Sequence, residues 1–355
     1  MSHSVHTSAS PAVPTTRKVT TGPESEIGLD SGDRLDIPTV DISPFLADPD
    51  SPAAQAIIPI VRSACRSTGF FQISGHGISK DLQQAVFAGA KKFFALPYET
   101  KKALDAHANQ GLRGYDVLAS QSYEDDILPD LKEGFYTGVD LPASDARVQA
   151  RRFLMGSNVW PEADLLPATE FREPVKAYHA ALMGLAIRVL RLIERTLPYG
   201  PGIFDEFIAN DPITPMRMLH YPPARPETER AGKTQYGASA HTDFGAITLL
   251  LQGDSPGLEV LDSRNGEEWV PVPPNPDVYV VNVGDMLSFW TKGEYKSSVH
   301  RVINREPGDR YSVVFFFDGN GDAKLAPLDG SQEEGDPLTV EQHMIRRVAE
   351  SYGKK

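Results

Sequence analysis

The chain has 355 residues, of which 40% are hydrophobic and 23% charged, values that are ordinary for a globular protein with a sizeable core. Its formal net charge of −13 argues against binding to nucleic acid, which needs a basic face, and it contains no apolar run long enough to span a bilayer. The single cysteine, Cys65, excludes an internal disulfide, and no secretory signal pattern is found at the N-terminus, so we expect a cytoplasmic protein.

Composition and periodicity divide the chain into three expected parts. Residues 1–34 are rich in Ser, Thr, Pro and Gly with almost no apolar periodicity, which predicts a disordered tail. Residues 35–170 are expected to form an N-terminal α/β portion with a long loop. Residues 171–355 are expected to form a helix, the catalytic core and a C-terminal helix.

The first ordered portion is expected to alternate short strands with helices. Strands are predicted at residues 37–42 and 70–73. Between them apolar residues recur at helical spacing, with Pro59 indicating either a kink or a late start and Gly69 the end of the helix. Ser79 is expected to cap the next helix.

Residues 105–170 lack a clear period, and Gly, Asp and Pro interrupt them repeatedly, so we expect a long loop region. Charge and aromatic rings concentrate in two short stretches of it, residues 113–115 and 130–136. Loops without a core of their own often serve as lids or binding segments, which makes this region a candidate border of a functional site.

The second portion begins with an amphipathic helix over residues 175–192, followed by a short helix at 203–209, and the period then changes to two. Strand candidates separated by turn residues follow at 215–221, 246–252, 258–261, 268–272, 278–283, 286–291, 297–303 and 311–317. Asn265-Gly266 and Gly284-Asp285 are two-residue hairpin signals. This spacing predicts a mostly β fold whose core is a double-stranded β-helix, or jelly roll, flanked by helices that include one at 339–352.

Two histidines and one aspartate form a candidate metal site in this half. His241 and Asp243 are two positions apart at the beginning of a strand pattern, so we expect their side chains to share a strand face. His300, in another strand-like segment, is the third candidate ligand. Two histidines and one carboxylate with open positions opposite are the ligand set of a non-haem Fe(II) oxygenase.

Arg310 and Ser312 follow His300 and share one face of a predicted strand. His241-x-Asp243, His300 and Arg310-x-Ser312, in this order and spacing, resemble the 2-oxoglutarate/Fe(II)-dependent dioxygenases of the isopenicillin N synthase-like family. The resemblance covers about residues 36–350, through further landmarks at 37–41, 68–78, 217–222 and 291–296.

The resemblance implies Fe(II) as the metal, with 2-oxoglutarate and O2 as co-substrates. Arg310 and Ser312 would bind the distal carboxylate of 2-oxoglutarate, because a guanidinium forms a charge-assisted bidentate pair with it, and Tyr221 would add a hydrogen bond. The cofactor then carries the chemistry: a C–H bond of a small organic substrate is oxidised, most simply hydroxylated, and succinate and carbon dioxide are released. The family branch also implies secondary metabolism.

Candidate substrate contacts come from the same resemblance. The family places the segment around residue 113 to residue 136 at the mouth of the active site, which makes Arg113, Phe135 and Tyr136 candidates. Phe244 and Phe317 are candidate walls of an apolar pocket around the metal. A purely structural role, in the core or in an exposed turn, is the alternative for each of them.

Two other functions use the same three ligands. An Fe(II) oxidase of this fold that does not use 2-oxoglutarate would keep the Arg-x-Ser pair for another anion. A zinc hydrolase or a non-catalytic metal-binding jelly roll would also suit three N/O ligands, although hydrolysis gives no role to Arg310 and Ser312. For the partners we expect a small-molecule substrate, no nucleic acid, no membrane, and a monomeric protein.

Overall fold

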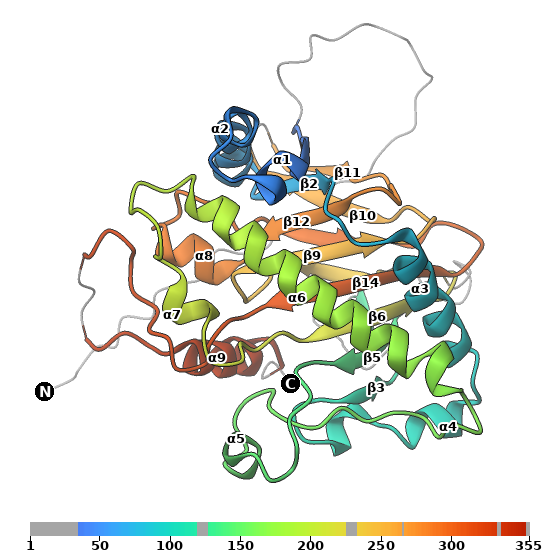
Figure 1. The fold of residues 1–355 in the computed structure, drawn as a ribbon. Helices are drawn as coiled ribbons and strands as arrows, with labels where there is room; N and C mark the ends of the chain where they lie inside the picture. Colours follow the sequence, from blue (N-terminus) through green and yellow to red (C-terminus); the bar gives the residue numbers. More distant parts are fainter. Residues whose placement is uncertain (1–34, 119–126, 225–232, 265, 332–334, 353–355) are drawn as a thin grey trace, which may run out of the picture. The chain divides into compact units, whose positions relative to one another are not determined.

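Two β-sheets organise the chain in the computed structural model (Figure 1), which describes residues 35–118, 127–224, 233–264, 266–331 and 335–352. The predicted disordered tail, residues 1–34, lies outside the described residues, and Leu35–Lys355 forms one compact unit. Strands from both predicted portions of the chain join the same large sheet.

Among the described residues, the major sheet has eight strands in the order β1-β2-β12-β9-β14-β6-β5-β3, and the minor sheet has four in the order β11-β10-β13-β8. The strands of the major sheet are β1 Thr39–Asp41, β2 Phe70–Ser74, β3 Gly114–Asp116, β5 Glu133–Thr137, β6 Met216–Tyr221, β9 Ile247–Gln252, β12 Tyr279–Val283 and β14 Arg310–Phe317. Those of the minor sheet are β8 Ala238–His241, β10 Leu258–Asp262, β11 Glu268–Pro271 and β13 His300–Val302. A separate short pair joins β4 Ile127–Leu128 to β7 Thr234–Gln235.

Helices flank the sheets. They are α1 Ser43–Ala47, α2 Pro52–Ser67, α3 Lys80–Phe94, α4 Tyr98–Lys102, α5 Ala146–Gln149, α6 Arg172–Glu194, α7 Asp205–Ile208, α8 Asp285–Trp290 and α9 Val340–Tyr352, with 3-10 turns η1 Ala106–Ala108 and η2 Ala168–Glu170. Ser79 caps α3 by accepting a hydrogen bond from the backbone N–H of Leu82, as predicted. The predicted end of α2 at Gly69 is also confirmed, with a φ of 69° that favours glycine. None of the described helices has the length and apolar character needed to cross a membrane.

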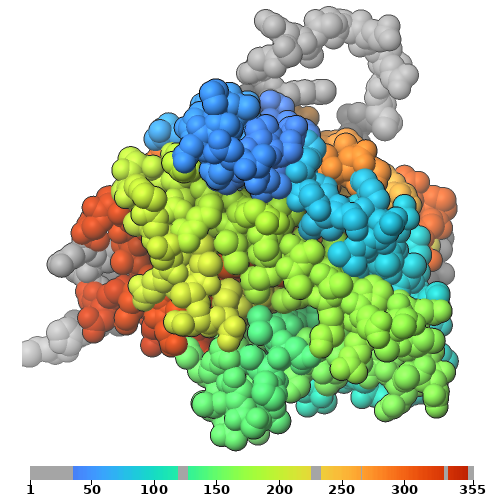
Figure 2. Space-filling model, viewed as in Figure 1, coloured from blue at the N-terminus to red at the C-terminus, as the bar shows by residue number. Residues whose placement is uncertain are grey.

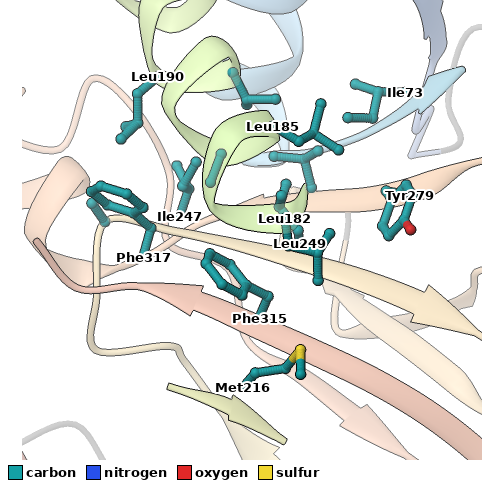
Figure 3. Packing of buried hydrophobic residues seen from close by; sticks show 14 of the residues in the cluster. Ile73, Leu182, Leu185, Leu190, Met216, Ile247, Leu249, Tyr279, Phe315 and Phe317 are labelled. Carbon is teal, nitrogen blue, oxygen red and sulfur yellow. The ribbon is translucent and has the colours of Figure 1, made fainter. Parts of the chain in front are cut away.

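The long helix α6 lies across one face of the major sheet (Figure 1) and buries its apolar stripe there. Leu182 and Leu185 lie over Leu249 and Phe315 of the sheet in the packing view (Figure 3). In the space-filling view the side chains of α3 and α6 cover much of this face of the sheet (Figure 2). This cluster is the main hydrophobic core, and it fixes the strands that carry the site on their opposite face.

The opposite face of the major sheet is directed to the minor sheet. A second, smaller apolar cluster combines Leu219, Tyr221 and Leu250 of the major sheet with Val260 and Val302 of the minor one. Two sheets that face each other across a narrow interior, with helices outside, confirm the predicted jelly-roll core.

One predicted strand is wrong. Residues 286–291 were expected to be extended, but α8 occupies them, and Gly284 begins this helix instead of forming a hairpin turn. Met286, Leu287 and Trp290 are its buried residues, and their spacing of one and four is helical. The hairpin between β10 and β11 is present, although Asn265 itself lies outside the described residues.

The expected loop region over residues 105–170 also needs correction, because β3 and β5 within it extend the major sheet beyond β6. The sequence of β5 lacks the alternation that predicts a strand, because both of its faces are buried and it includes a glycine. Helix α2 continues through Pro59, so the alternative of a late start is wrong. On α9, Val340 and Met344 are buried whereas Ile345 is 50% exposed.

Candidate metal and co-substrate site

His241, Asp243 and His300 converge at one end of the minor sheet. His241 ends β8, His300 begins β13, and the two residues are register partners across these antiparallel strands. Asp243 lies beyond the end of β8, in the turn before β9, and not on the strand face that the sequence predicted. Its Oδ1 is 3.7 Å from His241 Nε2 and 3.8 Å from His300 Nε2. These atoms form a three-ligand cluster that could hold a metal ion.

Hydrogen bonds orient each of the three side chains toward the common point. Nδ1–H of His241 donates to the Ser239 carbonyl at 2.7 Å, and Nδ1–H of His300 donates to the Ser298 carbonyl at 3.2 Å. A carbonyl only accepts, so both Nε2 atoms keep a lone pair for a metal. Asp243 Oδ2 accepts from Thr248 Oγ1 at 2.5 Å and from Asn282 Nδ2 at 2.8 Å, which leaves Oδ1 as the inward ligand.

The electrostatic setting keeps His241 and Asp243 in their metal-binding protonation states. Desolvation and the neighbouring His300 lower the pKa of His241. Burial would raise the pKa of Asp243, but the two histidines and the hydrogen bonds from Asn282 and Thr248 outweigh it and lower that pKa. A neutral imidazole and an ionised carboxylate are the forms that bind a cation.

An inner cavity of about 80 Å³ leads from this cluster between the two sheets to Arg310 and Ser312. Arg310 pairs in register with Tyr221, and Ser312 with Leu219, so all four side chains line the cavity from adjacent strands β14 and β6. The Arg310 guanidinium lies 4.8 Å from the centre of the Tyr221 ring, and its Nη2 donates to Gln252 Oε1 at 3.1 Å.

Arg310 is 1% exposed, yet its Nε and Nη1, like Ser312 Oγ, meet no hydrogen-bond partner among the described residues. Burial lowers the pKa of Arg310, an effect that the neighbouring Tyr221 opposes. Buried polar groups are normally satisfied, so a buried guanidinium with two nitrogens unused indicates a bound anion. A carboxylate has the paired oxygens that a guanidinium prefers.

An outer cavity of about 540 Å³ also reaches the metal cluster, and the residues that it shares with the inner one are Lys132, Arg217, His241, Asp243 and Phe316. Its remaining wall includes His107, Leu112, Asp116, Tyr136, Phe153, Leu154, Pro215, Phe244, Asp318, Met344 and Val348. The cavity thus has aromatic, aliphatic and ionisable surfaces within reach of the cluster, as a site for an organic substrate requires.

The predicted substrate contacts divide into two groups. Tyr136 and Phe244 line the outer cavity. Phe135 and Phe317 do not, because both are fully buried in the main core, and Arg113 is buried with its guanidinium donating to the carbonyls of Gly111 and Leu154. The expectation that these three border the substrate is therefore corrected.

Strand alternation explains the correction. Successive residues of a strand face opposite sides, so Tyr136 faces the cavity while Phe135 faces the core, and Phe316 takes the position expected for Phe317. No sequence pattern predicted that Lys132, Arg217 and Asp318 line a cavity. The alternation of Arg217, Leu219 and Tyr221 along β6 is the signal that could have identified one of them.

Comparison with known proteins agrees with this geometry. Residues 37–163 match the family model for the non-haem dioxygenase in morphine synthesis N-terminal region, and residues 213–319 match that of the 2OG-Fe(II) oxygenase superfamily. The chain is 58% identical over 322 residues to a 2-oxoglutarate-dependent dioxygenase, citB, of Monascus ruber, covering 90% of this chain and 96% of that one.

It is also 49% identical over 328 residues to clavatol oxidase claD of Penicillium crustosum, covering 89% of this chain and 96% of the relative. Among solved structures, Neurospora crassa T7H in complex with alpha-KG superposes with a TM-score of 0.76 at 27% identity, covering 91% of this chain and 98% of that one. The chain therefore belongs to the 2OG-Fe(II) oxygenase superfamily, and it is a dioxygenase that uses Fe(II), 2-oxoglutarate and O2 to oxidise a small molecule.

Proposed function

We propose that His241 Nε2, Asp243 Oδ1 and His300 Nε2 hold the Fe(II) of this enzyme. The convergence of these three atoms supports the assignment, as do the hydrogen bonds that direct both histidine lone pairs inward. Two nitrogens and one carboxylate oxygen also match the ligands that this metal takes in oxygenases with open coordination positions.

Arg310, Ser312 and Tyr221 are assigned to the distal carboxylate of 2-oxoglutarate. The single observation that carries this assignment is the fully buried guanidinium of Arg310, whose Nε and Nη1 find no partner in the described part of the chain. Ser312 Oγ, equally unpartnered, adds a second donor on the same strand face. Tyr221 covers the guanidinium from β6 and limits access of water to the pair.

Bound Fe(II), with 2-oxoglutarate and O2, supplies the oxidation of a substrate C–H bond, which we assign to hydroxylation. The protein's own residues hold the reactants in place and keep water away. Leu219, Leu250 and Val302 give the inner cavity apolar walls, and Tyr136 and Phe244 are assigned as substrate contacts in the outer cavity. The activity belongs, in this proposal, to secondary metabolism.

Three further properties belong to the proposal. The protein acts in the cytoplasm, as its single buried cysteine favours, and as a monomer. It has no nucleic-acid partner, since its formal charge of −13 repels a phosphate backbone.

Two measurements test the assignment: anaerobic Fe(II) binding and succinate release under air with and without 2-oxoglutarate. His241→Ala, Asp243→Ala and His300→Ala should each lose Fe(II) binding and turnover without unfolding. The control is His179→Asn. His179 lies on α6, is hydrogen-bonded to the Thr214 carbonyl, and belongs to neither the inner nor the outer cavity.

Full activity in any of the three ligand variants would refute the ligand assignment. Turnover without a 2-oxo acid would instead support the oxidase alternative, and hydrolysis without succinate the zinc alternative.

A further inference from the structure

Asp318 follows β14 and lines the outer cavity beside the metal cluster. It is 2% exposed, and burial and the charge of Asp243 are the influences on its carboxyl group, which makes no hydrogen bond or ion pair with the described residues. Burial, and next the negative charge of Asp243, raise the pKa of Asp318 to about 8. A buried carboxyl group without a partner is costly to maintain, so its presence at this wall calls for a ligand group that satisfies it.

The backbone opposite Asp318 is shaped to admit this carboxyl group. Gly245 follows the cluster residue Asp243 by two positions, and a Cβ added there would lie 2.0 Å from Asp318 Oδ1. Any side chain at position 245 would therefore displace the Asp318 carboxyl group from the cavity wall.

The cations of the outer cavity already have acidic partners. Arg217 Nη2 lies 2.9 Å from Asp116 Oδ2, and Lys132 Nζ lies 2.6 Å from Asp130 Oδ2. Arg310 in the inner cavity has no carboxylate within ion-pair distance among the described residues, so the two cavities differ in charge balance. The inner cavity suits an anion, whereas the described residues of the outer cavity offer no cation without an acidic partner, so the outer cavity suits a molecule without negative charge.

Three rings form much of the outer wall: Tyr136 on β5, Phe316 on β14 and Phe244 in the turn after β8. Two of them are backed by cations, since the Arg217 guanidinium lies 4.2 Å from the Tyr136 ring centre and that of Arg347 lies 4.8 Å from the Phe244 ring centre. These contacts hold the rings in place as flat surfaces for a planar substrate.

We propose that Asp318 is a substrate-binding residue that hydrogen-bonds a hydroxyl group of a neutral aromatic substrate lying between these rings. This inference rests on the proposed function, because the substrate is the one oxidised at the metal cluster. A hydroxyl group is the suitable complement because it donates to a carboxylate and accepts from a carboxylic acid. A carboxylate-bearing substrate would meet an unpaired carboxyl group and no cation without an acidic partner.

The test measures equilibrium binding to the anaerobic enzyme loaded with Fe(II) and 2-oxoglutarate, followed through its visible charge-transfer band. Three probes share one ring: orcinol, its dimethyl ether, and the matching dihydroxybenzoate. The variants are Asp318→Leu, which removes the hydrogen bond, Asp318→Asn, which keeps a polar partner, and Gly245→Ala, which displaces the carboxyl group. Glu194→Leu is the control for removal of a buried carboxylate, because Glu194 lies on α6 outside both cavities.

The wild-type enzyme should bind orcinol more tightly than either of the other two probes. Asp318→Leu and Gly245→Ala should weaken orcinol binding by about three- to tenfold while leaving the dimethyl ether unchanged, as expected for one lost hydrogen bond. Asp318→Asn should retain most of the wild-type difference in affinity between orcinol and its dimethyl ether. Glu194→Leu should lower thermal stability and leave the order of the probes as in the wild type.

Provided that the charge-transfer band forms, three results would overturn the inference. They are tighter binding of the dihydroxybenzoate than of orcinol, a preference for orcinol in Asp318→Leu equal to that of the wild type, and no response of the band to any probe. Absence of that band in the wild-type enzyme would overturn the proposed metal and 2-oxoglutarate assignments, and the inference with them.

Discussion

Arg310 and Arg217 lie on the same wall of the interior, on neighbouring strands, but in opposite electrostatic settings. Arg217 pairs with Asp116, whereas Arg310 is buried against Tyr221 and Gln252 with two nitrogens left for another acceptor. Because Arg310 is buried, little water competes for its guanidinium, and an anion bound there is held strongly.

Replacing Arg310 by Gln should weaken the apparent affinity for 2-oxoglutarate by about tenfold to a few hundredfold, because a charge-assisted pair contributes about 1.5 to 3 kcal/mol or more when buried. Anaerobic Fe(II) affinity should hardly change. Arg310→Lys should recover part of the loss, since it keeps the charge without the fork. Steady-state succinate formation against 2-oxoglutarate concentration measures the effect.

A matched control is Arg113→Gln, because Arg113 is also buried but lines neither cavity, and its guanidinium donates to the backbone carbonyls of Gly111 and Leu154. Its loss should lower stability and leave the 2-oxoglutarate requirement as it is. If Arg310→Gln has the same dependence on 2-oxoglutarate concentration as the wild type, the co-substrate assignment is wrong.

At the scale of elements, adjacent strands of the major sheet separate the core from the cavity by alternation. On β5, Phe135 packs against Phe93 with ring centres 4.5 Å apart, while the next residue, Tyr136, faces the outer cavity. Register with β6 then places Tyr136 opposite Arg217. One strand thereby supports the fold with one face and the site with the other.

Replacing Phe135 or Tyr136 by alanine should affect different properties: the first should lower the stability of the fold, and the second should weaken substrate binding. Phe135→Ala should cost about 3 to 5 kcal/mol of unfolding free energy, because it leaves a cavity in the main core. Tyr136→Ala should cost much less stability but weaken substrate binding, as a cavity-facing residue would. Chemical denaturation and probe binding measure the two effects, and equal behaviour of the variants would contradict the alternation.

A second element-level prediction concerns the junction of β5, β6 and the start of β14. His220 Nδ1 lies 2.7 Å from Glu133 Oε1, and its Nε2 lies 2.9 Å from Asp309 Oδ1. Burial alone would lower the pKa of His220, but the hydrogen bonds to Glu133 and Asp309 outweigh it and raise that pKa above 6.5. The imidazolium, which donates from both nitrogens, is the form that holds this junction together.

Because the folded-state pKa is raised, the stabilisation by His220 is fully present below pH 6.5 and is lost as the pH rises through the raised value. At the acid end Glu133 must stay ionised; burial would raise its pKa, but hydrogen bonds from His220, Lys101 and Tyr115 lower it below 4.5. The melting temperature of the wild type should therefore exceed that of His220→Gln most between pH 4.5 and 6.5, with a shrinking difference above. Parallel curves for the two proteins would disprove the prediction.

At the scale of the whole molecule, the site depends on two sheets that meet face to face. The minor sheet contributes both histidines, the major sheet contributes Arg310 and Ser312, and the turn that joins β8 to β9 contributes Asp243. The helices on the outer face carry no ligand and serve as the core that keeps the major sheet in position. Sites built from several elements in this way require the complete fold.

Residues 1–34 lie outside the described residues, and their composition gives no core-forming pattern. Deleting them should change neither the melting temperature nor turnover beyond experimental scatter, because Leu35–Lys355 forms a compact unit of its own. Differential scanning calorimetry and succinate formation of the truncated protein measure this. A clear fall in melting temperature would show that the segment contributes to the folded protein.

The sequence by itself predicted the candidate ligand types and their order. His241-x-Asp243, His300 and Arg310-x-Ser312 are readable from spacing alone, because metal and carboxylate chemistry restricts the residues that can take part. The jelly-roll core and the long helix were also predictable, since alternation and helical periodicity are local properties of the chain.

Only the tertiary structure decided which neighbours face the cavity and what environment each side chain meets. A shift of one residue in a strand exchanges core and cavity, as with Phe316 and Phe317, and short strands such as β5 give no local signal of their phase. Asp318 looks like any aspartate in the sequence, and its lack of a partner arises from segments distant in the chain that bury it. Burial and charge balance depend on long-range packing, so no local pattern can reveal them.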